Sequence, residues 1–124
     1  AKAASGSARF DAYVVCPASG TTIGKIAAGI SDNLATRSAL VAMKERRKLI
    51  IVPREAPYST PHLKAMFNLS EWGAVILPAS PGFYQSPRNI EDLIDFVVAR
   101  ILDQLDVDHT LGKRWTGEEV PSED

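Results

Sequence analysis

The sequence predicts an α/β fold in which a parallel β-sheet is covered by helices on both faces. Two observations support this prediction. Three short apolar runs rich in valine and isoleucine alternate with segments whose apolar residues recur at helical spacing. Each run also leads directly into a proline, which cannot donate a hydrogen bond to a sheet. Strands that alternate with helices pair in parallel through right-handed connections, so a parallel sheet follows.

The strands are expected at runs that are too short to form helices. They are residues 12–16 (AYVVC), 49–52 (LIIV) and 74–77 (AVIL). The prolines that follow them are Pro17, Pro53 and Pro78. Each proline is expected to mark the carboxyl end of its strand, where the chain leaves the sheet.

Four helices are expected between and after these strands, at residues 23–30, 34–46, 61–72 and 90–105. The last has the clearest pattern, because its apolar residues form one stripe that is expected to be buried. The stripe consists of Ile90, Leu93, Ile94, Val97, Val98, Ile101, Leu102 and Leu105. Asn89 is its expected N-cap, and Gly73 is expected to end the third helix.

Composition restricts the class of protein. With 124 residues, 45% of them hydrophobic and 23% charged, the chain has the composition of one globular domain, expected at residues 1–117, followed by a polar acidic tail at 118–124. The net charge of −1 argues against a broad nucleic-acid surface. The single cysteine, Cys16, cannot form an internal disulfide, so a cytoplasmic location is expected. Because the chain does not begin with methionine, we expect it to be the later part of a longer polypeptide.

The candidate site is the edge of the sheet where the parallel strands end, because ligands bind there in such folds. The segments that follow the strands are residues 18–22 (ASGTT), 54–59 (REAPYS) and 79–84 (ASPGFY). The hydroxyl and N–H groups of residues 19–22 could bind an anion or a polar ring edge, or could serve only as a turn and N-cap. Arg54 and Glu55 could act on a ligand or form a solvated ion pair.

Several other polar and aromatic side chains are candidates for the same site. Arg37 and Lys44 lie about 10 Å apart along one helix face, where they could grip an anion or face water. Arg100 borders the apolar stripe of the last helix, and its long side chain can reach solvent there. Tyr84 ends a loop rich in proline and glycine, and Trp115 stands in a polar segment.

Two further patterns are interpreted as ordinary features. Glu91, Asp92 and Asp95 resemble an acidic magnesium-binding motif, but acidic residues in a first helical turn are expected from the helix dipole. His62 and His109 stand alone, without metal-ligand spacing or an identifiable serine or cysteine partner. No metal site is therefore expected.

A series of motifs resembles the UbiX flavin prenyltransferases, a family within the flavoprotein superfamily that includes the cysteine decarboxylases. In chain order they are PASGTT, SDNLATR, LVAMKERRKLIIVPREAP, LPASPGFY, DFVVARILDQL and KRW. The resemblance extends over residues 3 to about 117 and implies a Rossmann-like fold. It also implies that the chain corresponds to the C-terminal three-fifths of a family member, without the family's N-terminal strands.

The resemblance implies a metal-independent transfer of a dimethylallyl group from dimethylallyl monophosphate to FMN. The product would be prenylated FMN, which serves UbiD-type decarboxylases and, through them, ubiquinone biosynthesis. The implied assembly is a homo-oligomer built from trimers, commonly a dodecamer, whose sites are shared between subunits. The alternatives are an FMN-dependent cysteine decarboxylase of the same superfamily and a non-catalytic flavin-binding subunit.

The resemblance also assigns roles to individual residues. The implied flavin contacts are Ser19, Gly20, Thr21, Thr22 and Arg54. The implied phosphate-binding residues are Arg37, Lys44, Arg54, Tyr84 and Arg100. Glu55 is the implied catalytic acid or base, assisted by Lys44, and Trp115 is an aromatic residue that closes over the site. The sequence leaves open whether Glu55 first gives or takes a proton.

Overall fold

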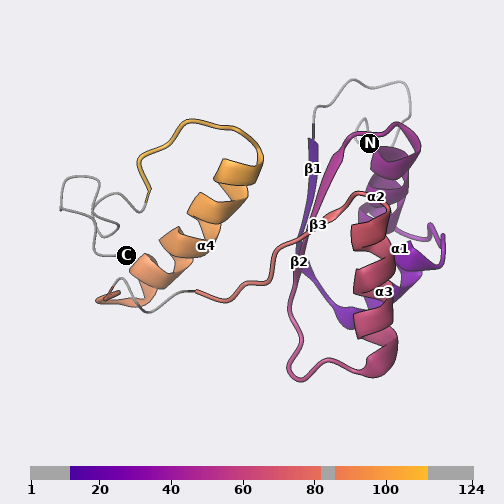
Figure 1. The fold of residues 1–124 in the computed structure, drawn as a ribbon, viewed down its shortest axis with the longest axis horizontal. Coiled ribbons are helices and arrows are strands. Elements are labelled where there is room, and N and C mark those ends of the chain that lie inside the picture. The colour runs from indigo at the N-terminus through magenta and orange to yellow at the C-terminus, as the bar shows by residue number, and fades with distance from the viewer. Residues whose placement is uncertain (1–11, 82–85, 112–124) are drawn as a thin grey trace. The chain divides into compact units, whose positions relative to one another are not determined.

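A computed structural model describes residues 12–81 and 86–111 of the chain. The chain divides into two compact units, with the boundary between Ala79 and Ser80. The first unit contains a parallel three-stranded sheet and the helices α1 to α3, and the second contains α4 (Figure 1). The parallel sheet with its alternating helices confirms the predicted α/β fold. The expected domain boundary after residue 117 lies outside the described residues and stays a prediction.

The sheet has the strand order β1-β2-β3, and both pairings are parallel. Its strands are β1 (Ala12–Ala18), β2 (Lys48–Pro53) and β3 (Val75–Ile76). In the register, Tyr13 lies opposite Leu49, and Ile51 lies opposite Ile76. The central strand β2 is buried from its second residue to its end, as expected for a strand with neighbours on both sides.

The prolines do not all end their strands. Pro53 is the last residue of β2, as predicted, and Pro78 follows the end of β3. Pro17, in contrast, lies inside β1, at an irregularity of the register between Val15 and Ala18. A proline is tolerated there because β1 is an edge strand among the described strands, so its backbone N–H is not needed for a second pairing. The prediction that Pro17 ends its strand is therefore wrong.

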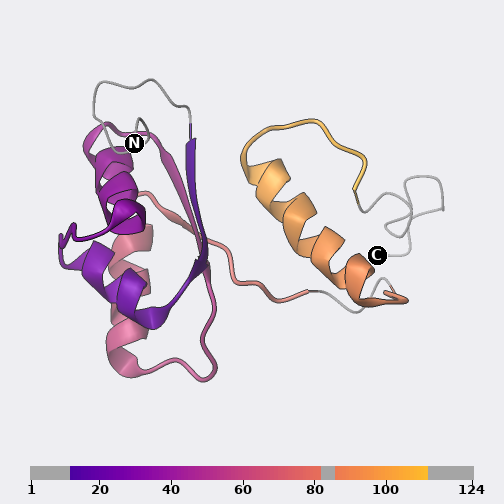
Figure 2. The same ribbon diagram turned by 180° about the vertical axis from the view of Figure 1, so that it is seen from behind.

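The three helices of the first unit lie on the same face of the sheet (Figures 1 and 2). They are α1 (Gly20–Ala27), α2 (Leu34–Lys44) and α3 (Thr60–Glu71). Each begins where a side chain accepts a hydrogen bond from a backbone N–H of the first turn, and these N-caps are Ser19, Asn33 and Ser59. Within residues 12–79, no helix covers the opposite face, so the predicted cover of both faces is not found in this unit.

Each of the three helices of this unit is followed, two residues after its last residue, by a residue with positive φ, and α2 and α3 show what this does. Arg46 has a φ of 59°, and the N–H of Arg47 donates to the carbonyl of Ala42 at 2.8 Å, which closes α2 at Lys44. The predicted end at residue 46 is thus two residues too late. Gly73, which follows the C-cap Trp72 of α3, has a φ of 105°, and this confirms that the helix ends before Gly73.

The core lies between the helices and the facing side of the sheet. Its strand residues include Tyr13, Val15, Leu49 and Ile51, and its helix residues include Ile23, Ile26, Ala39, Ala42, Met66 and Leu69. On the other face of β1, Val14 is 39% exposed and Cys16 is also exposed. The core therefore holds α1 and α3 firmly against the sheet and places their N-termini at its carboxyl edge.

In the second unit, α4 (Ile90–Gln104) begins where the periodicity predicts it and ends one residue earlier, with Asn89 as N-cap. Asp92 is buried, and its carboxylate accepts the N–H of Arg88 at 2.9 Å, so this acidic residue helps to begin the helix. The predicted burial of the apolar stripe is not found, because Ile90 and Ile94 are 70% and 54% exposed. The described part of this unit holds no second helix or strand that could cover them. None of the described helices is long and apolar enough to cross a membrane.

Candidate functional site at the carboxyl edge of the sheet

The segments that follow β1 and β2 meet at the carboxyl edge of the sheet, as the parallel order predicts. The N–H of Arg54 donates to the carbonyl of Ala18 at 3.0 Å. The N–H of Gly20 donates to Oε2 of Glu55 at 2.9 Å. Glu55 therefore lies at the N-terminus of α1, where the helix dipole favours a negative charge. We call the group formed by Ser19, Gly20, Glu55 and His62 the Gly20 corner.

Within this segment, Ser19 and Thr22 form hydrogen bonds with each other. Ser19 Oγ accepts the N–H of Thr22 at 3.1 Å, and its hydroxyl lies 3.2 Å from Thr22 Oγ1. These contacts are those of an N-cap, the alternative that the sequence left open. Thr21 is exposed. Contacts between residues 19–22 and a flavin stay a prediction.

His62 is a member of this corner that the sequence did not reveal. It is the third residue of α3, and its imidazole ring packs against Gly20, the first residue of α1. A Cβ atom at position 20 would lie 2.5 and 2.6 Å from Nε2 and Nδ1 of the ring. Nδ1 is buried and has no hydrogen-bond partner among the described residues. The sequence holds no signal for this pairing, because the packing of α1 against α3 creates it.

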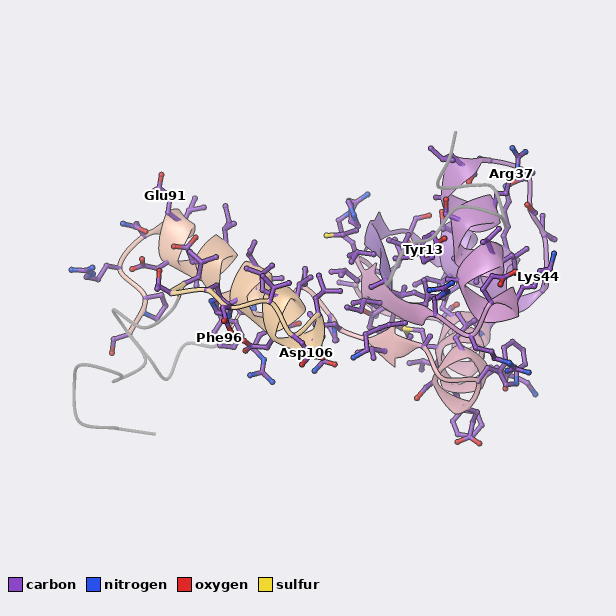
Figure 3. The ribbon with its side chains drawn as sticks, turned by 90° about the horizontal axis from the view of Figure 1, so that it is seen from above. Tyr13, Arg37, Lys44, Glu91, Phe96 and Asp106 are labelled. Atoms are coloured by element: carbon purple, nitrogen blue, oxygen red, sulfur yellow. The ribbon has the colours of Figure 1, made fainter. Side chains whose placement is uncertain are left out.

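The structure does not bring Lys44 to Glu55 within one chain. Lys44 ends α2, just before β2 begins at Lys48, whereas Glu55 follows the end of β2. The strand between them spans roughly 17 Å, so the two side chains belong to opposite edges of the sheet. Arg37 is exposed on the same helix, and both cations lie on the side of α2 that faces away from the strands (Figure 3).

The other predicted site residues divide between the two units and the undescribed parts of the chain. Arg54 is exposed beside Glu55. Arg100 belongs to α4, where its guanidinium lies 3.8 Å from Asp103 in an exposed ion pair. Tyr84 and Trp115 lie outside the described residues. The roles implied for all of these side chains stay predictions.

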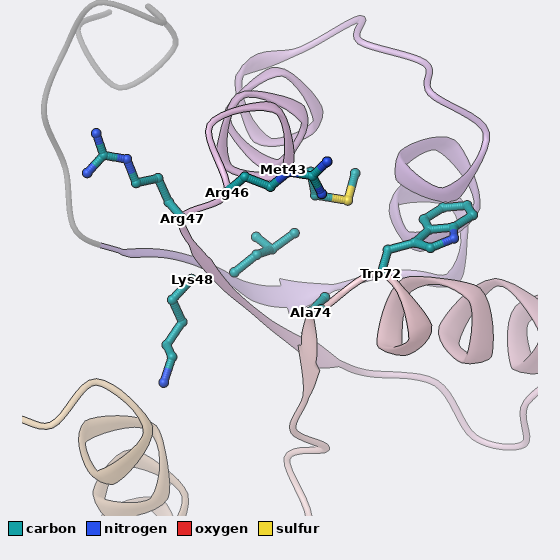
Figure 4. Close-up of a pocket in the computed structure, with 8 residues that line it drawn as sticks. Met43, Arg46, Arg47, Lys48, Trp72 and Ala74 are labelled. Carbon is teal, nitrogen blue, oxygen red and sulfur yellow. The ribbon is translucent and has the colours of Figure 1, made fainter.

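Two hollows lie away from the Gly20 corner. One, of about 370 Å³, is lined at the amino edge of the sheet by Met43, Arg46, Arg47, Lys48, Trp72 and Ala74 (Figure 4). Its cations do not converge, because the side chains of Arg47 and Lys48 point in different directions. The other, of about 560 Å³, follows β1 and the start of α2 and is lined largely by small and apolar residues. Among the described residues, no cluster of histidine, cysteine, aspartate or glutamate could hold a metal ion.

A comparison with known families decides the class of this protein. The sequence profile of the flavoprotein family matches residues 1–102. The chain belongs to the flavoprotein family. Among curated relatives of this flavoprotein, the flavin prenyltransferase UbiX of Thermoplasma acidophilum is 59% identical over 111 residues, which cover 90% of this chain and 62% of the relative. That of Pseudomonas aeruginosa is 51% identical over 121 residues, which cover 98% and 58%.

The flavoprotein thus spans between 58% and 62% of the length of these two relatives. The matches extend over 90% to 98% of the chain itself. These coverage percentages do not show which part of each relative's sequence the chain matches. The expected correspondence to the C-terminal three-fifths of a family member is therefore not borne out.

Solved structures agree with the fold of this flavoprotein. The dodecameric FMN-dependent UbiX-like decarboxylase from Escherichia coli O157:H7 superimposes with a TM-score of 0.85 at 46% identity, covering 88% of this chain and 60% of that one. AnUbiX (PadA1) in complex with FMN and dimethylallyl pyrophosphate superimposes with a TM-score of 0.84 at 46% identity, covering 87% and 57%. The Rossmann-like α/β fold is confirmed by these neighbours.

Proposed function

We propose that this flavoprotein is a flavin prenyltransferase, which transfers a dimethylallyl group from dimethylallyl monophosphate to FMN. The proposal is supported by relatives named flavin prenyltransferase UbiX, with identities of 46% to 59%. A solved neighbour at 46% identity was crystallised with FMN and a dimethylallyl diphosphate. The observation on this chain that matters most is the Glu55 carboxylate, held by the Gly20 N–H at the edge where such folds bind ligands.

The residues at this edge fit a flavin. Thr21, Arg54 and Glu55 are exposed there and offer the donors and acceptor that the polar edge of a flavin ring requires. The flavin supplies the carbon or nitrogen nucleophile of the reaction. Arg54 can bind an anionic group of either ligand through its planar guanidinium. The His62 ring fills the space that a side chain at Gly20 would need.

Glu55 is proposed to move the proton of the reaction. The bond between the dimethylallyl carbon and the phosphate oxygen breaks with both electrons on the oxygen, and a new bond joins that carbon to the flavin. One proton must leave the flavin, and the departing phosphate can take one up. A carboxylate between the two ligands can perform this transfer, while fixed cations stabilise the charge on the phosphate in place of a metal ion.

We propose that the cations missing from this edge come from other copies of the chain. Lys44 lies at the opposite edge of its own sheet, and Arg37 faces outward from the same helix. Outward-facing cations complete a site when a neighbouring subunit presents them to it. The proposed assembly is a homo-oligomer based on trimers, in line with the dodecameric state of a solved neighbour.

We also propose that a further segment of the same protein, N-terminal to this chain, pairs with the outer edge of β1. This edge has no neighbour among the described strands and is lined by a largely apolar hollow. An unpaired apolar edge is normally covered in a folded protein. A flavin-binding, stable monomer made from these 124 residues alone would contradict this proposal.

The decisive experiment incubates the complete protein with FMN and dimethylallyl monophosphate and follows the flavin by absorbance and mass. We expect a flavin heavier by one dimethylallyl group, and a parallel reaction with the diphosphate defines the leaving group. Glu55→Gln should lower the rate by about a hundredfold or more, because it removes the titrating group. Glu45→Gln, an exposed glutamate at the end of α2, is the matched control. Full activity of Glu55→Gln would exclude the proton-transfer role.

A second candidate is an FMN-dependent decarboxylase, because the Escherichia coli neighbour is named as one. Release of carbon dioxide from a peptide ending in cysteine, without prenyl transfer, would support it. Flavin binding with neither reaction would instead favour a non-catalytic subunit. A cytoplasmic location and delivery of the prenylated flavin to a UbiD-type decarboxylase remain part of the proposal.

A further inference from the structure

We infer that His62 is a positioning residue of the Gly20 corner: its ring holds Gly20 so that the Gly20 N–H fixes the carboxylate of Glu55. A Cβ atom at position 20 would lie within 2.6 Å of both ring nitrogens, a distance that real Cβ atoms do not adopt. Glycine at position 20 and histidine at position 62 are therefore a matched pair.

The backbone of Gly20 joins His62 to Glu55. On one side Gly20 meets the imidazole ring, and through its N–H it donates to Oε2 of Glu55 at 2.9 Å. The direction of this N–H follows the axis of α1, because Gly20 is the first residue of that helix. A shift of the α1 N-terminus would therefore move the carboxylate or break its hydrogen bond.

General packing of the two helices does not explain the ring. Ile23 of α1 and Met66 and Leu69 of α3 already lie in the buried core that joins both helices to the sheet. His62 adds a contact at the N-terminal ends only. Its Nδ1 is also buried without a partner among the described residues, which is costly for a side chain that serves packing alone.

The contact between His62 and Gly20 should have a local effect that can be measured without an activity assay. Removal of the ring by His62→Ala should free Gly20 and raise the hydrogen exchange rate of its amide by roughly fivefold, as expected for loss of one hydrogen bond. Glu55→Ala should raise it by a similar factor, and the double variant should show no further increase. Mass spectrometry on overlapping peptides around residue 20 measures these rates, with the amide of Leu69 as the reference for global unfolding.

Two further variants test whether faster exchange at Gly20 reflects the loss of the ring contact or a general loss of folding. His62→Asn keeps a polar group near Nδ1 but removes the ring edge that touches Gly20, so it should behave like His62→Ala. Lys64→Ala, an exposed neighbour on α3, should leave exchange at Gly20 unchanged. Unchanged exchange at Gly20 in both His62 variants would overturn the inference.

The pairing of residues 20 and 62 can be tested separately through stability. Gly20→Ala alone should lower the melting temperature, because the new methyl group meets the ring. In the His62→Ala background the same change should lower it much less, since the ring is gone. Equal effects in the two backgrounds would refute the proposed contact.

The catalytic consequence rests on the proposed function. His62→Ala should lower kcat for prenyl transfer by about tenfold while the KM for FMN changes less than about threefold, because a displaced carboxylate affects reaction more than binding. In a Glu55→Gln background, His62→Ala should cause no further loss. Independent losses would show that His62 does not act through Glu55. If the complete protein transfers no prenyl group, the proposed function fails, and the exchange rates still decide the role of His62.

Discussion

Two neighbouring side chains constrain Gly20 from different directions. Together they explain why this residue is a glycine. The His62 ring occupies the space of a side chain, and Glu55 accepts the backbone N–H. A glycine near a ligand site is often explained by the space that the ligand needs. Here the space is filled by the protein itself, so the glycine is required by packing between α1 and α3.

The ion pair between Lys25 and Asp32 predicts a pH dependence of stability. Lys25 Nζ lies 2.8 Å from Asp32 Oδ2, and this hydrogen bond lowers the pKa of Asp32 below its ordinary value of 3.8. The stabilisation is complete above the unfolded pKa and is lost as the pH falls through the lowered folded pKa. Asp32→Asn should therefore reduce the acid-dependent loss of unfolding free energy, which denaturant titrations near pH 7 and pH 3 measure.

The effect at Asp32 should be small, because both partners are partly exposed to solvent. Lys25→Met offers the control, since it removes the same hydrogen bond from the other side. A full acid dependence in both variants would show that this pair does not contribute to the pH response.

The backbone conformation of Arg46 indicates that a glycine at this position would stabilise the protein. Its φ of 59° lies in the left-handed region, which is unfavourable for residues with a side chain. Arg46→Gly should raise the free energy of unfolding by about 0.5–1 kcal/mol, as measured by equilibrium denaturation. Arg47→Gly, at the next position, should give no such gain.

At the scale of elements, the start of α2 depends on a reciprocal cap. Asn33 Oδ1 accepts the N–H of Thr36 at 2.8 Å, and Thr36 Oγ1 accepts the N–H of Asn33 at 3.1 Å. Asn33→Ala should lower the free energy of unfolding by about 1 kcal/mol in chemical denaturation. Asn33→Asp retains the acceptor and should stay close to the parent protein, so an equal loss in both would contradict the capping role.

Element types were predictable from the sequence, whereas several ends were not. All three strands and four helices occur close to the expected places. However, α1 begins at Gly20, because the Ser19 cap sets its start, while apolar periodicity pointed to residue 23. Pro17 stays within β1, since the irregularity of the register accommodates it. The ends of helices and strands depend on single hydrogen bonds and on strand pairing, which the periodicity of apolar residues does not reveal.

At the scale of the whole molecule, the separation of Lys44 from Glu55 predicts complementation between subunits. If each proposed site takes Glu55 from one copy and Lys44 from another, mixed oligomers of Glu55→Gln and Lys44→Ala chains contain some intact sites. Co-expression in equal amounts should restore about a quarter of the parent prenyl-transfer activity, on statistical grounds. Each variant alone should be nearly inactive. No recovery in the mixture would place both residues in the same copy's site or exclude Lys44.

The candidate site was predictable only where the fold class itself determines position. Parallel strands bring the segments after β1 and β2 to one edge, so the proximity of Ser19, Arg54 and Glu55 followed from strand order. The seven-residue spacing of Arg37 and Lys44 placed them on one helix face, but did not reveal that Lys44 stands at the far edge of the sheet. His62 was interpreted as an isolated histidine, because Gly20, which its ring contacts, is distant in sequence.

The α/β class, the parallel order, and the edge at which Glu55 and Arg54 stand were predictable from the amino-acid order. They follow from the alternation of short apolar runs with helical periodicity, which is a local property of the chain. The folded chain was needed to find that His62 fills the space beside Gly20, and that the Gly20 N–H binds the carboxylate of Glu55. These contacts depend on how α1 packs against α3 and against the segment that follows β2, and local patterns in the sequence do not specify that packing.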